Sequence, residues 1–192
     1  MSKAKFDLVI VGVGGQGTLL ASRILGHIAL AEGCDVKVSE VHGMSQRGGS
    51  VITYVRVGEK VYSPIVTPGE ADYLLSFEEL EAARAALYLK KGGTAIVNRQ
   101  KIWPMPVITG AASYPENPLD QMGDVKVESA DALSIAIGCG SQRALNLVLL
   151  GMLSRHLPFG EDVWKEAISL CVPRKTLPVN LAAFEQGRMI GE

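Results

Sequence analysis

The sequence has few cysteines, no excess of charge of either sign and no long apolar run, and each absence excludes a class of protein. Its three cysteines lie far apart and form no C-x-x-C pair, so we expect no zinc or iron–sulfur site within the chain. A net charge of −1 gives no electrostatic basis for binding nucleic acid or an anionic membrane. Because no apolar run reaches membrane-spanning length and the N-terminus has no signal-peptide pattern, we expect a cytoplasmic protein.

What is present is the composition of a globular domain. The chain has 192 residues, of which 47% are hydrophobic and 20% charged. This length supports one substantial core and is too short for two ordinary enzyme domains. We therefore expect a single domain over residues 1–192, bound by neither nucleic acid nor membrane.

Predicted strands alternate with predicted helices along most of the chain. The expected strands are an apolar run from Phe6 and residues 35–41, 51–57, 71–77, 94–98 and 125–128. The expected helices are residues 18–30, 78–90, 131–137, 143–156, 158–172 and 176–189. This alternation predicts an α/β fold, a three-layer, doubly wound, Rossmann-like structure with a mostly parallel sheet. A hairpin turn at residues 58–60, leading into residues 61–63, predicts an antiparallel addition. Four prolines make residues 99–123 mostly irregular, with one extended piece at 106–109.

A glycine cluster between the first strand and the first helix is the first candidate site. Gly12, Gly14 and Gly17 have G-x-G-x-x-G spacing. Unpaired N–H groups at a helix start, with no Cβ nearby, form a site for phosphate or another anion. We assign a cofactor-binding role to Gly12, Gly14, Gly15, Gln16 and Gly17. The alternative is a tight strand–helix turn that binds nothing.

The second candidate site is the loop after the second predicted strand. In a doubly wound sheet the first two strands are neighbours, so we expect the two loops to face each other across one crevice. Arg47 is a permanent planar cation suited to phosphate or carboxylate. We assign a cofactor-binding role in this loop to His42, Ser45, Gln46, Arg47, Gly48 and Gly49. The alternative is that the loop packs against another subunit without touching a ligand.

Glu40 supports a different function. It ends the second predicted strand, where a dinucleotide-binding protein holds the ribose. A stand-alone NAD- or FAD-binding protein is therefore one alternative, and a nucleotide- or coenzyme A-binding module without chemistry is another. We can assemble no Ser-His-Asp set, catalytic carboxylate pair or metal-ligand spacing, so the catalytic residue is unknown and no metal site is expected.

Several motifs together resemble one enzyme family. They are Gly12-Val-Gly-Gly-Gln-Gly17, residues 40–51, Ala71-Asp72 followed by Glu78 and Glu81-Ala82, Tyr114-Pro115, and Asn146-Leu-Val-Leu-Leu-Gly151. On these residues the chain resembles the gamma-type subunit or domain of the 2-oxoacid:ferredoxin oxidoreductases, and within that family the indolepyruvate-dependent branch. The resemblance covers essentially the whole chain.

The resemblance implies an activity that this chain carries out only with a partner. Such enzymes oxidatively decarboxylate a 2-oxoacid, here indolepyruvate or another aryl pyruvate, with coenzyme A to give an acyl-CoA, CO2 and reduced ferredoxin. Thiamine diphosphate, Mg2+ and the 4Fe–4S clusters belong to the larger partner subunit, which also delivers electrons to ferredoxin. The chain alone is then inactive, binds no cofactor tightly, and forms a homodimer or aggregates when isolated. Its loops either help to bind coenzyme A or close the partner's active site.

Overall fold

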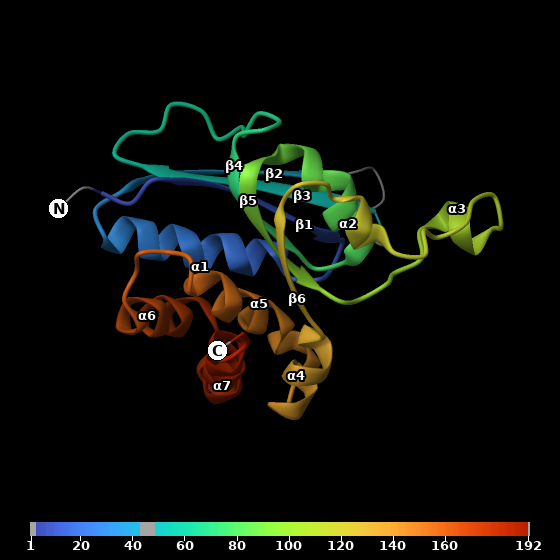
Figure 1. Cartoon of the computed structure of the whole chain (residues 1–192). Coiled ribbons are helices and arrows are strands. Elements are labelled where there is room, and N and C mark those ends of the chain that lie inside the picture. The colour runs from blue at the N-terminus through green and yellow to red at the C-terminus, as the bar shows by residue number, and fades with distance from the viewer. Residues whose placement is uncertain (1–2, 43–48, 192) are drawn as a thin grey trace.

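A six-stranded sheet with helices on both faces forms the centre of the protein, in a computed structural model that describes residues 3–42 and 49–191 (Figure 1). The strands are β1 (Phe6–Val13), β2 (Asp35–His42), β3 (Ser50–Gly58), β4 (Ala71–Ser76), β5 (Leu89–Asn98) and β6 (Lys126–Ala130). The α-helices are α1 (Thr18–Ala31), α2 (Glu79–Ala85), α3 (Met105–Ile108), α4 (Ala132–Gly138), α5 (Leu145–Ser154), α6 (Glu161–Cys171) and α7 (Leu177–Arg188). Short 3-10 helices are η1 (Ala86–Tyr88), η2 (Pro118–Gln121), η3 (Gln142–Ala144) and η4 (Arg174–Thr176).

The strand order is β2-β3-β1-β4-β5-β6, and β3 runs against its neighbours. The pairs β1–β4, β4–β5 and β5–β6 are parallel. The expected α/β fold, with a mostly parallel sheet and an antiparallel addition, is confirmed. Helices on both faces are what connects parallel strands in such a sheet.

Two details of the expected sheet are wrong. The first two strands are not neighbours, because β3 lies between β1 and β2 and pairs with both. The antiparallel hairpin is β2–β3, and residues 61–63 form no strand after Gly58. Backbone groups of the loop after Gly58 bond to side chains instead of to a neighbouring strand. The N–H of Val61 donates to Asp35 Oδ2 (2.8 Å), and the Arg56 guanidinium donates to the carbonyl of Ile65 (3.0 Å).

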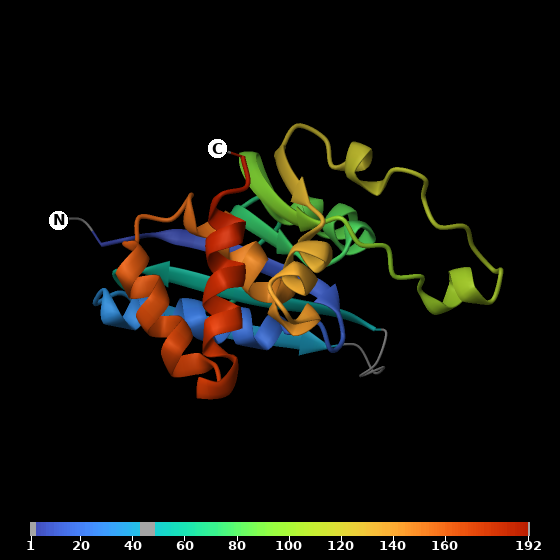
Figure 2. The same cartoon turned by 90° about the horizontal axis from the view of Figure 1, so that it is seen from below.

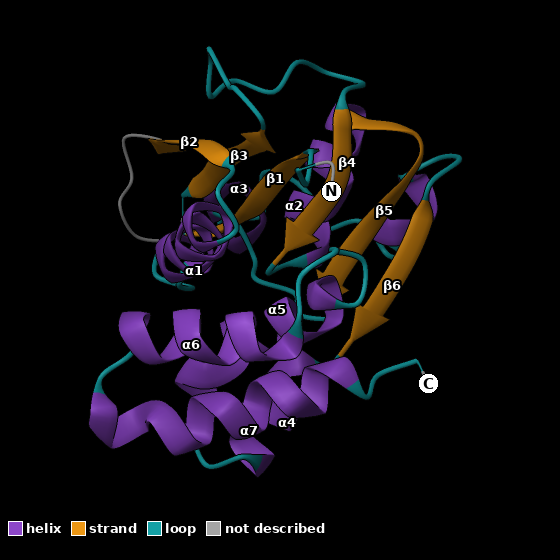
Figure 3. Cartoon of the chain, turned by 90° about the vertical axis from the view of Figure 1, so that its left-hand side faces the viewer, coloured by secondary structure: helices purple, strands orange, loops and turns teal. Residues whose placement is uncertain are grey.

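The sheet separates two apolar cores, as alternation along β1 requires. Leu8 and Ile10 pack with α1, α5, α6 and α7 on one face, while Val9 and Val11 pack with α2 on the other. Figure 2 shows the larger group of helices in front of the sheet, and Figure 3 shows these helices below it as a separate layer. None of the helices in the described part of the chain is long and apolar enough to cross a membrane.

Helix α5 is buried along its whole length, as its all-round apolar sequence predicts. It crosses α7 at two glycines that allow backbone contact. A Cβ on Gly151 would lie 2.2 Å from the carbonyl oxygen of Phe184, and one on Gly187 would lie 2.0 Å from that of Val148. No side chain larger than hydrogen fits this crossing.

Two further expectations are wrong at the level of single elements. The helix expected over 78–90 ends as α2 and η1, because β5 already begins at Leu89, opposite Ala71 of β4. Gly92, at φ +74°, lies within β5, where the register with β4 shifts. The extended piece expected at 106–109 is the short helix α3, which starts after Pro104.

The segment between β5 and η2 carries α3 away from the body of the protein (Figures 1 and 2). We call residues 99–117 of this segment the arm.

Candidate functional site

The glycine turn after β1 has a backbone that requires glycine at two positions. Gly15 (φ +98°) and Gly17 (φ +91°) are left-handed, a conformation that side chains rarely adopt. At Gly12 the limit is space, because a Cβ there would lie 2.8 Å from Gln16 Oε1. The residues that the structure describes supply no acceptor for the N–H groups of Gly15, Gly17 and Thr18. Donors at the start of a helix that have no partner among the described residues can bind an anion.

The second loop returns to the sheet directly beside this turn. The N–H of Gly14 donates to the carbonyl of Gly49 (3.0 Å), and Val13 lies opposite Ser50 in the β1–β3 ladder. The two loops thus share one edge of the sheet, although β1 and β2 are not neighbours. The side chain of His42, together with Ser45, Gln46, Arg47 and Gly48, lies outside the described residues.

Gln16 ties the turn to the ends of β4 and β5. Its Oε1 accepts from the N–H of Val13 (2.7 Å), and its Nε2 donates to the carbonyl of Phe77 (3.1 Å) and to Gln100 Oε1 (3.3 Å). Asn98 Nδ2 donates to the same two oxygens, both at 3.1 Å. Gln16, which we assigned to cofactor binding, thus has its side chain engaged with the protein itself.

The network continues to the first turn of α4. The side-chain oxygen of the fully buried Asn98 accepts from the N–H of Ala132 (3.0 Å). Sequence reasoning missed Asn98 and Gln100 as site residues. The available signal was polar side chains at and directly after the last residue of a buried strand, at the carboxyl edge where ligands bind.

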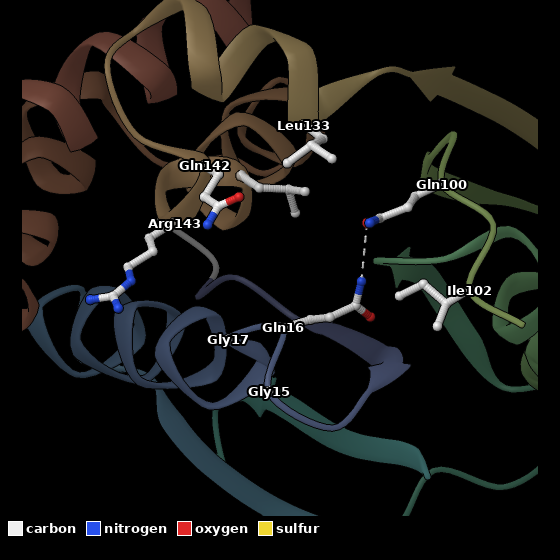
Figure 4. A pocket seen from close by; sticks show the side chains of 9 residues that line it. Gly15, Gln16, Gly17, Gln100, Ile102, Leu133, Gln142 and Arg143 are labelled. Carbon is white, nitrogen blue, oxygen red and sulfur yellow. Dashed lines mark hydrogen bonds between the residues drawn. The ribbon is translucent and has the colours of Figure 1, made fainter. Parts of the chain in front are cut away.

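A cleft of about 640 Å³ opens between the glycine turn, the end of β5, and the segment from α4 to α5 (Figure 4). It is lined by Gly15, Gln16, Gly17, Gln100, Ile102, Leu133, Gln142, Arg143 and Leu145. Figure 4 shows Gln142 and Arg143 on the wall across from the turn. N–H groups with no acceptor among the described residues, a guanidinium at the edge of the cleft and the apolar side chains of Ile102, Leu133 and Leu145 suit a ligand with an anionic end and an apolar body.

Arg143 is the cation of this cleft that sequence reasoning missed. Its side chain is exposed and has no acidic partner among the described residues. The hydroxyl of Ser141 accepts from its N–H (3.3 Å), which fixes the start of η3. This bond fixes the backbone of Arg143 and leaves its guanidinium available for phosphate or carboxylate.

Glu78 is a buried carboxylate at the start of α2. Its side chain caps the helix by accepting from the N–H of Glu81 (2.8 Å). Its other oxygen accepts from the N–H of Ile102 (3.1 Å) and from the hydroxyl of Tyr114. Burial, followed by the hydrogen bond to Glu78, raises the pKa of Tyr114. Two residues of the family motif, far apart in sequence, are therefore one structural contact.

Other motif residues also hold the fold together. Glu81, almost fully buried, accepts from the hydroxyl of Ser50 at the start of β3. Asp72 accepts from the N–H of Asp7 (2.7 Å) across β1 and β4. Asn146 packs against Gly17, since a Cβ on that glycine would lie 3.0 Å from Asn146 Nδ2. These contacts support the glycine turn and its neighbouring strands.

Glu40 does not lie where a dinucleotide-binding strand would place it. It is on β2, and β3 separates β2 from β1, a distance of about 10 Å for two strand spacings. The hydroxyl of Thr53 on β3 donates to Glu40 Oε2 (3.1 Å). The position of Glu40 therefore disfavours ribose binding next to the glycine turn.

Residues 3–42 and 49–191 contain no group of three or more His, Cys, Asp or Glu side chains placed to hold a metal ion. The three cysteines are free thiols, of which Cys34 is buried. Burial raises the pKa of the Cys171 thiol. The raised pKa makes the Cys171 thiol a poor nucleophile and a poor metal ligand.

Comparison with known proteins gives consistent relatives over nearly the whole chain. Residues 7–190 match the family model described as pyruvate ferredoxin/flavodoxin oxidoreductase. The indolepyruvate oxidoreductase subunit IorB of Thermococcus kodakarensis is 47% identical over 192 residues, covering 95% of this chain and 94% of the relative. The same subunit of Pyrococcus horikoshii is 44% identical over 190 residues, with coverage of 95% and 94%.

One solved structure shows the fold inside a longer polypeptide. It is a 2-oxoglutarate:ferredoxin oxidoreductase from Magnetococcus marinus, determined with 2-oxoglutarate, coenzyme A and succinyl-CoA bound. The match has a TM-score of 0.75 and 20% identity, and covers 98% of this chain but 31% of that one. At this identity the likeness concerns the fold alone.

Proposed function

Because the chain belongs to the pyruvate ferredoxin/flavodoxin oxidoreductase family, we propose that it is the smaller subunit of an enzyme that oxidises indolepyruvate or a related aryl pyruvate. The reaction decarboxylates the 2-oxoacid, transfers the acyl group to coenzyme A and passes the electrons to ferredoxin. The supporting observation for the substrate is full-length similarity to two indolepyruvate oxidoreductase subunits. The chain is one subunit of a hetero-oligomer and is inactive alone.

The redox groups belong to the larger subunit in this proposal. Thiamine diphosphate with Mg2+ starts decarboxylation there, and 4Fe–4S clusters carry the electrons. The residues of this chain do not fit those groups, because cluster ligation takes four cysteine thiolates and the three here are separated. The described side chains also offer no set of three metal-binding groups. The contribution of this chain is therefore binding and enclosure, not electron transfer.

We assign to the cleft beside the glycine turn the binding of an anionic part of coenzyme A. The observation that carries this assignment is that Gly15 and Gly17, whose N–H groups have no acceptor among the described residues, and Arg143, whose guanidinium has no acidic partner among them, line one cavity. Phosphate groups are bound by such donors. The apolar wall, with Ile102 and Leu133, suits the uncharged part of the same molecule. Gly49, at the end of the second loop, bonds to Gly14 of the glycine turn next to this cleft.

Steady-state kinetics of the assembled complex test this assignment. Arg143→Ala is expected to raise the KM for coenzyme A about tenfold, the usual effect of losing one charge-assisted hydrogen bond. The KM for the aryl pyruvate stays unchanged. Arg174→Ala, which removes an exposed arginine of η4 that does not line the cleft, is the matched control. An unchanged KM for coenzyme A in Arg143→Ala contradicts the assignment.

A stand-alone NAD- or FAD-binding protein is the competing function. The displacement of Glu40 by one intervening strand disfavours it. Calorimetric titration of the isolated chain with NADH, FAD and coenzyme A separates the two. Tight binding of NADH or FAD contradicts the subunit function.

A further inference from the structure

The arm (residues 99–117) leaves the body of the protein between β5 and η2 and returns to it. In Figures 1 and 2, α3 stands at its far end, away from the sheet and from all other helices. Three large apolar side chains are exposed there: Trp103 (61%), Met105 (65%) and Ile108 (61%). An apolar group of this kind on a projecting segment is typical of a surface that another protein covers.

The base of the arm is held firmly, in contrast to its tip. The carboxylate of Glu78 accepts from the backbone of Ile102 on the outgoing side and from the hydroxyl of Tyr114 on the returning side. Lys101 Nζ donates to the carbonyl of Glu116 (3.0 Å), which joins the two sides again. The arm is therefore closed at its base and presents its tip in a defined direction.

The tip also carries no charge. Residues 102–114 contain no Asp, Glu, Lys or Arg, although charged residues are 20% of the chain. Within this run, Met105 and Ile108 are one helical turn apart on α3 and Trp103 precedes them, so they form one apolar end. A tryptophan and two flexible aliphatic side chains are the residue types that anchor interfaces by entering an apolar pocket.

We propose that the arm is a docking element whose tip enters an apolar groove on the larger, thiamine-bearing subunit. The proposal rests on the function proposed above. The choice of partner follows from position, because the base of the arm lines the cleft: Gln100 and Ile102 form its wall. A larger subunit that completes its reaction centre at this cleft approaches the same edge of the sheet. In the Magnetococcus marinus oxidoreductase the same fold is about a third of a longer polypeptide.

Affinity measurements between the purified chain and the larger subunit test the proposal. The variant combines Trp103→Ser, Met105→Ser and Ile108→Ser. Its control combines Leu30→Ser, Leu170→Ser and Met189→Ser, which remove apolar groups of 64%, 65% and 52% exposure from the helical side of the body. The arm variant is expected to bind at least about tenfold more weakly, and the control within about twofold of the wild type. Melting temperatures verify that both variants fold, and Ile108→Lys serves as a single-site arm variant.

Each other outcome overturns the proposal in a distinguishable way. If the wild-type chain does not bind the larger subunit, the proposed function fails together with the docking arm. If the wild type and the arm variant bind it equally, the function stands and the docking arm is wrong. If the arm variant loses only self-association, measured by sedimentation of the isolated chain, the tip contacts a second copy instead.

Discussion

The side-chain amide of Gln16 donates to the side-chain oxygen of Gln100 at 3.3 Å, which joins the glycine turn after β1 to the end of β5. The two residues are 84 positions apart in sequence. Both line the cleft that separates the turn from η3 (Figure 4). The bond fixes the cleft wall between two strands that are not neighbours in the sheet.

Gln16→Ala is expected to destabilise the protein. It removes the acceptor of the Val13 N–H and the donor to Phe77 and Gln100, so the expected loss in free energy of unfolding is about 1–3 kcal/mol. Urea denaturation of the isolated chain measures it. Gln186→Ala, at an exposed position of α7, is the control and should change stability by less than about 0.5 kcal/mol. Equal effects of the two substitutions contradict the role of Gln16.

Gly187→Ala is expected to disrupt the crossing of α5 and α7. The new methyl group would lie 2.0 Å from the carbonyl oxygen of Val148, which forces the helices apart at a cost of about 3 kcal/mol. Gly26→Ala on α1 has nothing within 4 Å and should stabilise the helix by about 0.5–1 kcal/mol. Thermal melting of both variants measures the contrast. A stable Gly187→Ala protein contradicts backbone contact at this crossing.

Tyr114 is expected to make the stability fall at alkaline pH. Burial raises the pKa of its phenol above the ordinary value of 10.0, so the folded state holds the proton more tightly than the unfolded state. The stabilisation is complete below pH 10.0 and is lost as the pH rises above this value toward the folded-state pKa. The measurement is the difference in free energy of unfolding between the wild type and Tyr114→Phe, from neutral to strongly alkaline pH. A difference that is constant across this range contradicts the assignment.

Arg47→Ala is expected to lower the activity of the assembled complex about tenfold, the effect of losing one charge-assisted contact. Arg47 belongs to the sequence between β2 and Gly49, and Gly49 bonds to the glycine turn. The melting temperature of the isolated chain should stay the same. Arg174→Ala is again the control. Unchanged turnover of the complex shows that Arg47 has no part in binding.

Local pattern was sufficient to predict most elements of the fold. The turn, α1 and the left-handed Gly33 (φ +69°) after it follow from glycine placement and apolar periodicity. The order of strands did not follow from pattern. Residues 50–58 could form a strand between β1 and β2 or a strand at the edge of the sheet beyond β2. Either arrangement would pair these residues antiparallel with β2 and would give the same alternation of polarity, so the sequence of this segment does not distinguish them.

The sequence predicted the backbone part of the candidate site, the glycine turn, but not the side chains that surround it. The glycine spacing identifies the turn, and Gly49 does lie beside it. The missed side chains come from two other segments, the end of β5 and η3, which meet the turn only after the sheet and α5 have packed. They are Asn98, Gln100 and Arg143. Their partners are 2 to 84 positions away, and the residue types alone do not select them from other polar residues.

The close crossing of α5 and α7 has a consequence for the width of the cleft. Its spacing depends on the absence of side chains at Gly151 and Gly187. Helix α5 follows η3 without a break, and Asn146 in its first turn packs against Gly17, so the position of α5 determines how far Arg143 stands from the start of α1. The crossing thereby acts as a spacer for the ligand opening, although neither glycine lines it.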